Sequence, residues 1–304
     1  MVRRCVRFGP DRSGIGPPLA CALAVALGLL APAGSRGDEL ALGSPRPAAS
    51  RVWTDVYAES FGWSRASGAS RDPDVVPTLR LRGLYALAPE LGLDLHAYFG
   101  VQITRDVASR AAGVLSTIYA DNRAIMAPGL LLRAWSGRVG VFAQAGAAVD
   151  LLGKAGTRFD ARAGAFLGIE SQRCWAHAGS GVELRIDPCA EVYSEAVYLS
   201  RFQDDVVGFA RGRLGASYLV TGPVSWGLVA QVRTGASRNQ SYWDNYVDGG
   251  AGVRWRLLAP FHADLLATVD RGTYYGVAAR DPAPSPLAYT ELRLLFSTYL
   301  EFRP

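Results

Sequence analysis

Lysine, histidine and cysteine are scarce in this 304-residue sequence, and their scarcity limits the chemistry that the chain can perform. Lys154 is the only lysine, so arginine carries every other positive side-chain charge, and only three histidines are present. No Cys-x2-Cys or His-x3-His spacing occurs, although zinc sites usually show short ligand spacings of this kind. The sequence therefore predicts no metal site and no bound cofactor.

Long apolar runs are also missing, except near the N-terminus. Arg3, Arg4 and Arg7 precede an apolar run over residues 19–30, and small residues at positions 35 and 37 follow it. This order is typical of a secretory signal peptide. We predict one over residues 1–37, with a second candidate cleavage site at residues 31–33, and a short periplasmic lead-in over residues 38–49. Beyond the signal, no stretch reaches the roughly eighteen apolar residues that a membrane-spanning helix requires.

Net charge is small once the signal is removed. Residues 1–37 contain five arginines and one aspartate, which leaves 27 basic and 26 acidic residues in the rest of the chain. Nucleic-acid binding requires a clustered basic face, so no nucleic-acid partner is predicted. The chain is nevertheless apolar on average, with a mean hydropathy of +0.10, and it contains 34 glycines. A secreted chain with this composition and no helical span is typical of a lipid-facing β-barrel.

Alternating apolar and polar residues predict strands along most of the mature chain. Residues 78–87, 93–104, 139–150 and 226–233 follow a period of two, the period of a strand with two different faces. Most of these runs are longer than the strands of soluble proteins, which are mostly about five or six residues long, and match the roughly nine to eleven residues of a tilted membrane strand. Aromatic residues near strand ends fit the interfacial girdles of membrane barrels: Trp135, Tyr242, Trp243, Trp255 and Tyr275.

Short and long connections alternate along the sequence, as they do in outer-membrane barrels. Short turns are expected at 89–90, 136–137, 221–223 and 259–260, and long external loops at 65–76, 105–118, 236–245 and 276–286, with residues 203–205 also external. The segment Leu292–Phe302 resembles the closing strand that the barrel-assembly machinery recognises. We predict an all-β fold: a transmembrane antiparallel barrel of about twelve strands over residues 50–304, in contact with the lipids of the bacterial outer membrane, with no soluble second domain.

The strand number depends on the segment that begins at Cys174. Bacterial single-chain barrels have an even number of strands, and one crossing by residues 174–186 would make the number odd. A straight strand would also separate Cys174 from Cys189 by roughly 40 Å, far beyond disulfide reach. We therefore predict a hairpin folded back at residues 179–181 and closed by a Cys174–Cys189 disulfide. It either projects from the periplasmic rim of a twelve-stranded barrel or crosses twice in a fourteen-stranded one.

Three segments carry a family resemblance: AEVYSEAVYLSRFQDDVVGFARGRLG at 190–215, WDNYVDGGAGVRWRL at 243–257, and VDRGTYYGVAARDPAPSPLAYTELRLLFSTYL at 269–300. From about residue 159 onward the chain resembles the C-terminal domain of the phage N-four adsorption protein A (NfrA) family, an outer-membrane receptor paired with an exopolysaccharide system. The resemblance implies an outer-membrane barrel and traffic of polysaccharide. Because the lead-in is short, it also implies that any periplasmic scaffold or inner-membrane synthase is a separate partner.

Charged and aromatic residues on the expected inward faces form a candidate lumen and transport surface. Its members are Glu191, Tyr193, Glu195, Arg201, Arg211, Arg213, Asp248, Arg254, Arg256, Asp270 and Arg293, with Asp204 and Asp205 beside them. One interpretation is a salt-bridged, hydrated lumen, whose paired charges could even seal the pore. The other is a polar track along which sugar chains slide, with Tyr193 and Tyr299 as stacking faces.

Three functions follow from these features. The first is a non-enzymatic channel for exopolysaccharide export or for small solutes. The second is a surface receptor or structural barrel of the phage-adsorption type, with a closed lumen. The third is an enzyme at the outer rim, but His96 and His262 follow short periplasmic turns, and His177 lies in the predicted Cys174–Cys189 hairpin. The glycine-rich segment at 249–252 lies within a strand, not before a helix, so a phosphate-binding loop is excluded.

Overall fold

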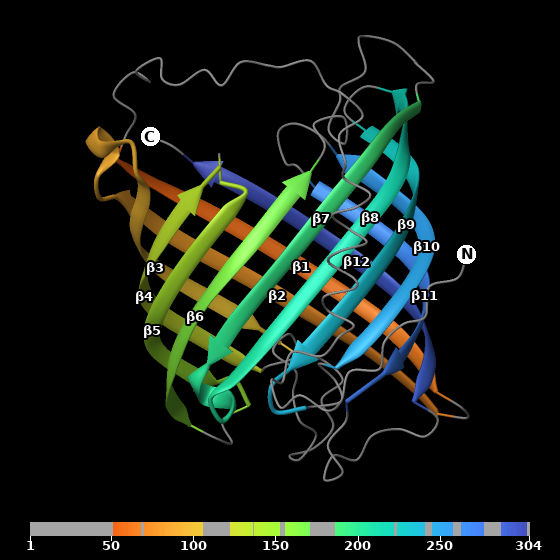
Figure 1. Cartoon of the computed structure of the whole chain (residues 1–304), viewed down its shortest axis with the longest axis horizontal. Helices are drawn as coiled ribbons and strands as arrows, with labels where there is room; N and C mark the ends of the chain where they lie inside the picture. Colours follow the sequence, from red (N-terminus) through yellow and green to blue (C-terminus); the bar gives the residue numbers. More distant parts are fainter. Residues whose placement is uncertain are drawn as a thin grey trace, which may run out of the picture. The chain divides into compact units, whose positions relative to one another are not determined.

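Twelve antiparallel strands close into a barrel in the computed structural model (Figure 1). The structure describes residues 51–67, 70–105, 122–135, 137–152, 156–170, 186–221, 224–240, 245–257, 263–276 and 287–302. The strands are β1 (Val52–Ser67), β2 (Ser70–Ala86), β3 (Asp94–Thr104), β4 (Arg123–Ala134), β5 (Val139–Asp150), β6 (Thr157–Glu170), β7 (Ile186–Leu199), β8 (Asp205–Thr221), β9 (Val224–Ser237), β10 (Tyr246–Leu257), β11 (Ala263–Tyr274) and β12 (Ala288–Phe302). Two 3-10 turns, η1 (Pro89–Leu91) and η3 (Ser200–Phe202), lie between strands.

Each strand pairs with its neighbours in the sequence, and β12 returns to pair with β1. The closing pair runs from Thr54 opposite Phe302 to Ala66 opposite Thr290. Closure gives every strand a partner on both sides, so no strand has a wholly open edge of the kind that promotes aggregation. The predicted all-β antiparallel barrel of twelve strands is therefore confirmed, and the predicted closing strand Leu292–Phe302 lies within β12.

The two faces of each strand differ in polarity and exposure, as the alternation in the sequence predicts. On β2 and β3, Leu79, Leu81 and Phe99 point outward and are 42%, 44% and 54% exposed, whereas Leu84 and Tyr98 point inward and are 2% and 7% exposed. An outer face covered with exposed leucine, valine and phenylalanine fits the hydrocarbon of a bilayer and exceeds what a soluble monomer normally leaves in contact with water. Among the described residues, no helix is long and apolar enough to cross a membrane.

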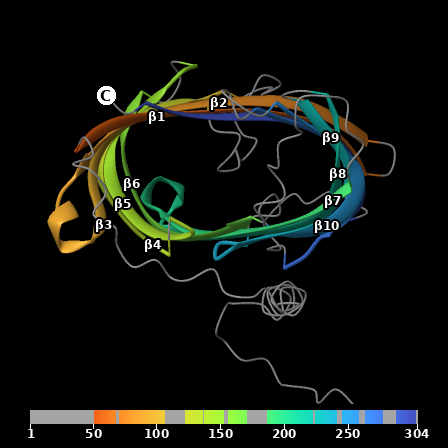
Figure 2. The same cartoon turned by 90° about the horizontal axis from the view of Figure 1, so that it is seen from above.

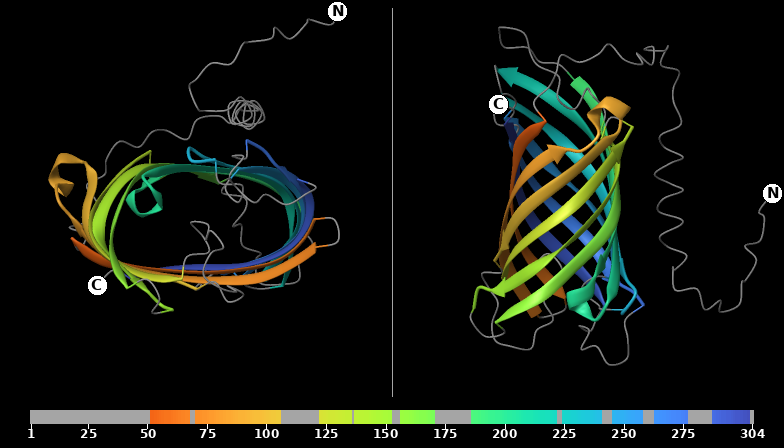
Figure 3. Two further views of the ribbon diagram at one scale, coloured as in Figure 1. Left: turned by 90° about the horizontal axis from the view of Figure 1, so that it is seen from below. Right: turned by 90° about the vertical axis from the view of Figure 1, so that its left-hand side faces the viewer.

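The strands are tilted (Figure 3), and the two ends of the barrel carry different connections. We call the end with the β2–β3, β4–β5 and β8–β9 connections the turn end, and the opposite end, with η3, the loop end. Trp135, Trp226, Trp255 and Tyr85 are exposed on the outer face near the turn end. Trp135 and Trp255 are among the predicted girdle residues; Tyr242 and Trp243 lie outside the described residues.

The fourteen-strand alternative is wrong. β6 pairs directly with β7, from Arg162 opposite Leu199 to Glu170 opposite Glu191, and the ring closes with twelve strands. Cys189 is buried and disulfide-bonded. Cys174 lies outside the described residues, so its pairing with Cys189 stays a prediction.

The long loop expected at residues 65–76 is also wrong. β1 and β2 continue as a paired ribbon to Ser67 opposite Ser70. The prolines of β2 do not end the strand, which pairs with β3 only from Thr78 onward. The segment before Pro77 lies outside this ladder, and Pro77 takes part there through its carbonyl, which accepts a hydrogen bond from the N–H of Arg105 at 3.0 Å. This hydrogen bond does not require the N–H that proline lacks, so proline is tolerated at this end of β2.

Aromatic rings packed over inward glycines fill part of the barrel interior. A Cβ atom on Gly129 would lie 2.5 Å from Cζ of Tyr98, its cross-strand partner, and one on Gly164 would lie 2.9 Å from Cε1 of Phe142. Tyr98 also packs in an apolar cluster with Trp53 and Leu84. Glycine is required at these positions because any side chain would displace the ring. These contacts fix the packing inside β3–β6.

Candidate functional site in the lumen

The predicted lumen residues lie where the alternation places them. Glu191, Tyr193, Glu195, Arg211, Arg213, Asp248, Arg254, Arg256, Asp270 and Arg293 lie on the inward faces of β7, β8, β10, β11 and β12, and Arg201 lies in η3. Their distribution along the barrel divides them into two networks of ion pairs, one contact at the loop end, and one group at the centre.

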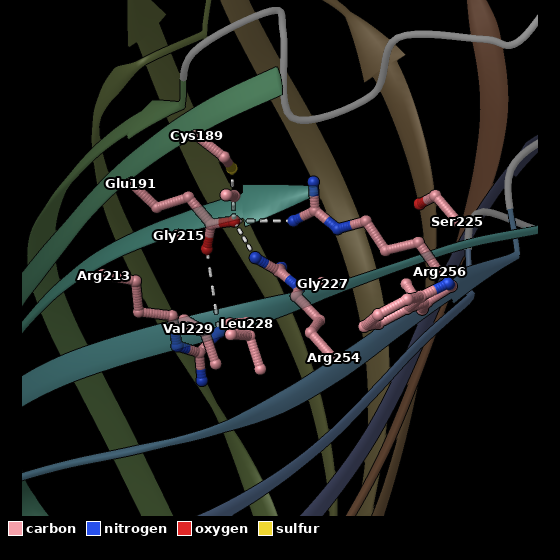
Figure 4. Close-up of a pocket in the computed structure, with 12 residues that line it drawn as sticks. Cys189, Glu191, Arg213, Gly215, Ser225, Gly227, Leu228, Val229, Arg254 and Arg256 are labelled. Atoms are coloured by element: carbon pink, nitrogen blue, oxygen red, sulfur yellow. Dashed lines mark hydrogen bonds and ion pairs between the residues drawn. The ribbon is translucent and has the colours of Figure 1, made fainter. Parts of the chain in front are cut away.

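Glu191 is the centre of the first network (Figure 4). Its Oε1 accepts a hydrogen bond from Nη2 of Arg256 at 2.6 Å and another from Arg254, and its Oε2 lies 3.7 Å from Nη1 of Arg213. Nε of Arg254 also donates to both carboxylate oxygens of Asp264 at 2.8 Å. All five side chains belong to residues that are at most 9% exposed. These residues therefore do not line open water.

The Glu191 network spans several strands and borders a small cavity. Arg256 on β10 donates through Nη2 to Oε1 of Glu170 on β6, at 2.8 Å. The cavity is lined by the network residues Glu191, Arg213, Arg254 and Arg256 together with Cys189, Ser225 and Gly227 (Figure 4). Because β6 and β10 are four steps apart in the strand order, this contact joins separate parts of the barrel wall.

Arg233 on β9 is the centre of the second network. It donates to both oxygens of Asp248 at 2.9 Å, to Oδ2 of Asp270 at 3.2 Å and to Oε1 of Glu291 at 3.1 Å. Arg293 donates to the same oxygen of Glu291 at 2.8 Å. Arg233 is 1% exposed, and Asp270 and Glu291 are 0% exposed. One guanidinium thus serves three buried carboxylates from three strands.

Uncharged polar groups complete the second network and link it to the first. The hydroxyl of Tyr289 donates to Asp248 at 2.9 Å, and Nε2 of Gln231 donates to the two oxygens of Asp270 at 3.1 and 3.0 Å. Nε of Arg213, from the Glu191 network, donates to Oε1 of Gln231 at 3.1 Å. A buried charge is tolerated only when it is paired and hydrogen-bonded. The combined network therefore fastens β6–β12 on the inside.

At the loop end, η3 is anchored to β6. Nε of Arg201 donates to Oδ2 of Asp160 at 2.5 Å, and Nε of Arg162 donates to Oδ1 of the same carboxylate at 2.7 Å. The backbone N–H of Ala161 donates to the hydroxyl of Ser200 at 2.8 Å. Figure 2 shows η3 inside the outline of the barrel when it is viewed along its axis. The β7–β8 connection therefore narrows this end of the lumen.

At the centre, Tyr193 and Glu195 on β7 form a unit with Arg211 on β8. The Tyr193 hydroxyl donates to Oε2 of Glu195 at 2.7 Å, and the Arg211 guanidinium lies 5.8 Å from the centre of the Tyr193 ring. Tyr193 and Arg211 are direct cross-strand partners. All three are partly exposed, unlike the two networks. We call these residues the β7–β8 module.

The same arrangement recurs on β1 and β2, where the sequence interpretation named no lumen residue. The Tyr57 hydroxyl donates to Oε2 of Glu59 at 2.5 Å, and the Arg80 guanidinium lies 5.1 Å from the centre of the Tyr57 ring. Tyr57 and Arg80 are again cross-strand partners. We call these the β1–β2 module. The signal for it was present as a repeat: DVYAES at 55–60 resembles EVYSEA at 191–196.

Arg233, Asp264 and Glu291 were also absent from the predicted lumen surface. Arg233 is the last residue of a predicted strand, and Glu291 precedes the predicted closing strand. The alternation already places both side chains on the inward face, yet the predicted lumen surface includes neither. Their importance lies in their partners on other strands, which alternation alone does not identify.

The histidines give no sign of a catalytic or metal site within the described part of the chain. His96 is 3% exposed, packs edge-on against Trp53 with ring centroids 4.6 Å apart, and contacts Asp94 and Arg133. His177 and His262 lie outside the described residues. Asp264, two positions after His262 in the sequence, accepts a hydrogen bond from Arg254. The described residues contain no group of three or more His, Cys, Asp or Glu that could hold a metal ion.

The chain is similar to known proteins in structure but not in sequence. No protein-family profile matches the chain, and no curated protein matches it in sequence. The resemblance to the NfrA family therefore stays a prediction.

Among solved structures, an outer-membrane channel from Pseudomonas putida F1 is similar with a TM-score of 0.38 and 13% identity, covering 88% of this chain and 100% of that one. OmpT, an outer-membrane protein of Vibrio cholerae, is similar with a TM-score of 0.29 and 10% identity, covering 81% of this chain and 98% of that one. The outer-membrane channel DcaP of Acinetobacter baumannii is similar with a TM-score of 0.26 and 8% identity, covering 83% of this chain and 96% of that one. At this identity the likeness concerns the fold.

Proposed function

We propose that this protein is a non-enzymatic channel of the bacterial outer membrane that passes polar solutes through the centre of its lumen. The observation that carries the proposal is the difference in exposure inside the barrel. Asp270 and Glu291 are 0% exposed on the β11–β12 side, whereas inward polar residues such as Gln102, Gln144 and Arg211 keep accessible surface on β3, β5 and β8. A polar inner face that remains accessible inside an apolar outer face is the arrangement of a water-filled membrane barrel.

The solute class within this proposal is carbohydrate, either as a polymer under export or as small sugars. The resemblance of residues 190–215 and 243–300 to the NfrA family supports it, as do the tyrosines of the two central modules, because an aromatic side chain offers an apolar face beside a polar hydroxyl. For a polymer, a separate periplasmic scaffold or an inner-membrane synthase would be the partner that delivers the chain to the barrel.

A closed receptor or structural barrel is the second candidate, and the Arg233 network favours it. Three carboxylates around one guanidinium, all buried, leave no space for solvent at that level of β9–β12. The interior of a twelve-stranded barrel is small enough for side chains to fill much of it. If the network extended across the whole lumen, the external loops would carry the function by binding a partner such as a phage.

Planar-bilayer recording of the refolded protein separates the two candidates. We expect stepwise single-channel currents. Gly168 points inward on β6, and a Cβ atom there would lie 3.8 Å from the Tyr193 ring; Gly168→Trp should therefore lower the conductance. Gly83 points outward on β2, and a Cβ atom there would have no neighbour within 4 Å, so Gly83→Trp is the matched control and should conduct like the wild type. Folded protein that carries no current would overturn the channel in favour of the closed barrel.

A further inference from the structure

The two central modules occupy opposite positions in the barrel. β1 and β7 are six steps apart in either direction around the ring of twelve strands, and so are β2 and β8. The ring is oval (Figure 2), so its long walls approach each other. In Figure 1, β7 and β8 run along the wall in front of β1 and β2, which lie on the opposite wall. The modules therefore face each other across the lumen as a pseudo-twofold pair.

The repeat extends to the residues on the turn-end side of the two modules. Asp55 pairs with Arg82 across β1 and β2, as Glu191 pairs with Arg213 across β7 and β8. Arg82 donates to Asp55 through Nε at 3.0 Å, and Arg213 lies 3.7 Å from Glu191. Arg82 and Arg213 thus each have a carboxylate partner on the adjacent strand.

The arginines of the modules themselves, Arg80 and Arg211, differ in their partners. Among the described residues, neither Arg80 nor Arg211 forms an ion pair, and the contact that each makes is with the ring of its own tyrosine. Nε of Arg80 is buried with no hydrogen-bond partner among the described residues. The nearby carboxylates of Glu59 and Glu195 accept hydrogen bonds from the tyrosine hydroxyls instead. Within the part of the chain that the structure describes, two guanidinium groups at the centre of the lumen therefore have donors without a protein partner.

We propose that Arg80 and Arg211 form a binding site for the carboxylate of an acidic sugar, at the narrow centre of the lumen. The inference rests on the proposed channel and narrows its solute from carbohydrates in general to acidic sugars. A guanidinium binds a carboxylate in a planar, two-pronged geometry, and opposed guanidinium groups can approach it from both walls. A carboxylate has about four acceptor positions, so Glu59 and Glu195 can also accept hydrogen bonds from sugar hydroxyls. A neutral sugar makes only the second kind of contact, so the site discriminates by charge.

Current block by galacturonate, with galactose as the neutral comparison, tests this site in planar bilayers. We expect galacturonate to block the wild-type channel at lower concentration than galactose does. In the Arg80→Gln/Arg211→Gln double variant, the galacturonate concentration for half block should rise by about tenfold or more, because two charge-assisted hydrogen-bonding groups are lost. The ratio of chloride to potassium permeability should fall in the same variant. Block by galactose should change little.

Arg271→Gln is the matched control, because it removes a guanidinium from the exposed outer face of β11 and should leave block and permeability as in the wild type. Arg80→Lys/Arg211→Lys, which keeps both charges, should retain part of the galacturonate block. Heat-modifiable migration on a gel verifies that each variant is folded. Equal galacturonate block in the wild type and the folded Gln variant would overturn the site while leaving the channel standing.

If the wild type carries no current, the channel proposal fails, and the site is tested by calorimetric titration of galacturonate into the protein folded in detergent. Binding by the wild type that is lost in Arg80→Gln/Arg211→Gln supports an anion site in a closed barrel. Absence of binding, or equal binding by both proteins, refutes the site.

Discussion

Replacing Arg233 with methionine tests whether the second network is as deeply buried as the structure shows. The change removes four hydrogen bonds of 2.9 to 3.2 Å and leaves three buried carboxylates without their shared cation. Breaking a buried ion pair by removing one partner costs about 3–5 kcal/mol. Each carboxylate keeps some support, since Tyr289 still donates to Asp248, Gln231 to Asp270 and Arg293 to Glu291. We therefore expect a loss of about 3 kcal/mol in the free energy of unfolding, at the lower end of that range.

Urea unfolding of the barrel in lipid vesicles, followed by tryptophan fluorescence, measures this loss. Arg271→Met is the matched control: its guanidinium lies on the exposed outer face of β11, and surface changes usually shift stability by no more than about 0.5 kcal/mol. The double variant Arg233→Met/Asp248→Asn removes one of the stranded charges and should recover about 1 kcal/mol. If Arg233→Met were as stable as the control, water would reach the network, and the lumen would be open at β9–β12.

Two further predictions concern the wall of the barrel. Gly129→Ala should destabilise it by about 1–3 kcal/mol, because the new methyl group would lie 2.5 Å from the Tyr98 ring; Gly83→Ala, with open space at its Cβ position, should cost much less, and equal costs in urea unfolding would contradict the ring-over-glycine contact. Leu228→Arg, on the outer face at 54% exposure, should cost about 2–4 kcal/mol in vesicles, whereas Leu91→Arg at the turn end should cost about 0–1 kcal/mol. No difference between these two arginine variants would argue against a lipid-facing band.

Most of the fold could be predicted from the alternation of apolar and polar side chains in the sequence. In a closed barrel every residue of a strand faces either the lumen or the outside, so a period of two assigns each side chain directly. That is why Leu292 and Leu294 could be placed outward and Arg293 inward from the sequence alone. Parity likewise predicted twelve strands if the Cys174 segment did not cross, and the direct pairing of β6 with β7 agrees.

Contacts across the lumen could not be predicted in the same way. Arg256 meets Glu170, which is 86 positions away in the sequence, and Arg233 meets Glu291, 58 positions away. Which inward charges meet depends on strand stagger and on the oval section of the barrel, and neither leaves a local pattern in the sequence. The loop expected at 65–76 was wrong because the alternation of short and long connections does not show how far two paired strands extend past their neighbours. β1 and β2 stay paired to Ser67 opposite Ser70.

Substitutions in the two buried networks and substitutions in the two central modules should have different effects. The charges around Arg233 and Glu191 are paired and buried, so changing one alters the energy of the fold and leaves the accessible surface at the centre almost unchanged. Arg80 and Arg211 have no ion pair among the described residues, so neutralising them costs little stability but changes the charge that a solute meets. Arg233→Met should therefore lower stability while the galacturonate block stays near that of the wild type, and Arg80→Gln/Arg211→Gln should do the reverse. A variant pair in which both properties changed together would show that the network and the modules form a single unit.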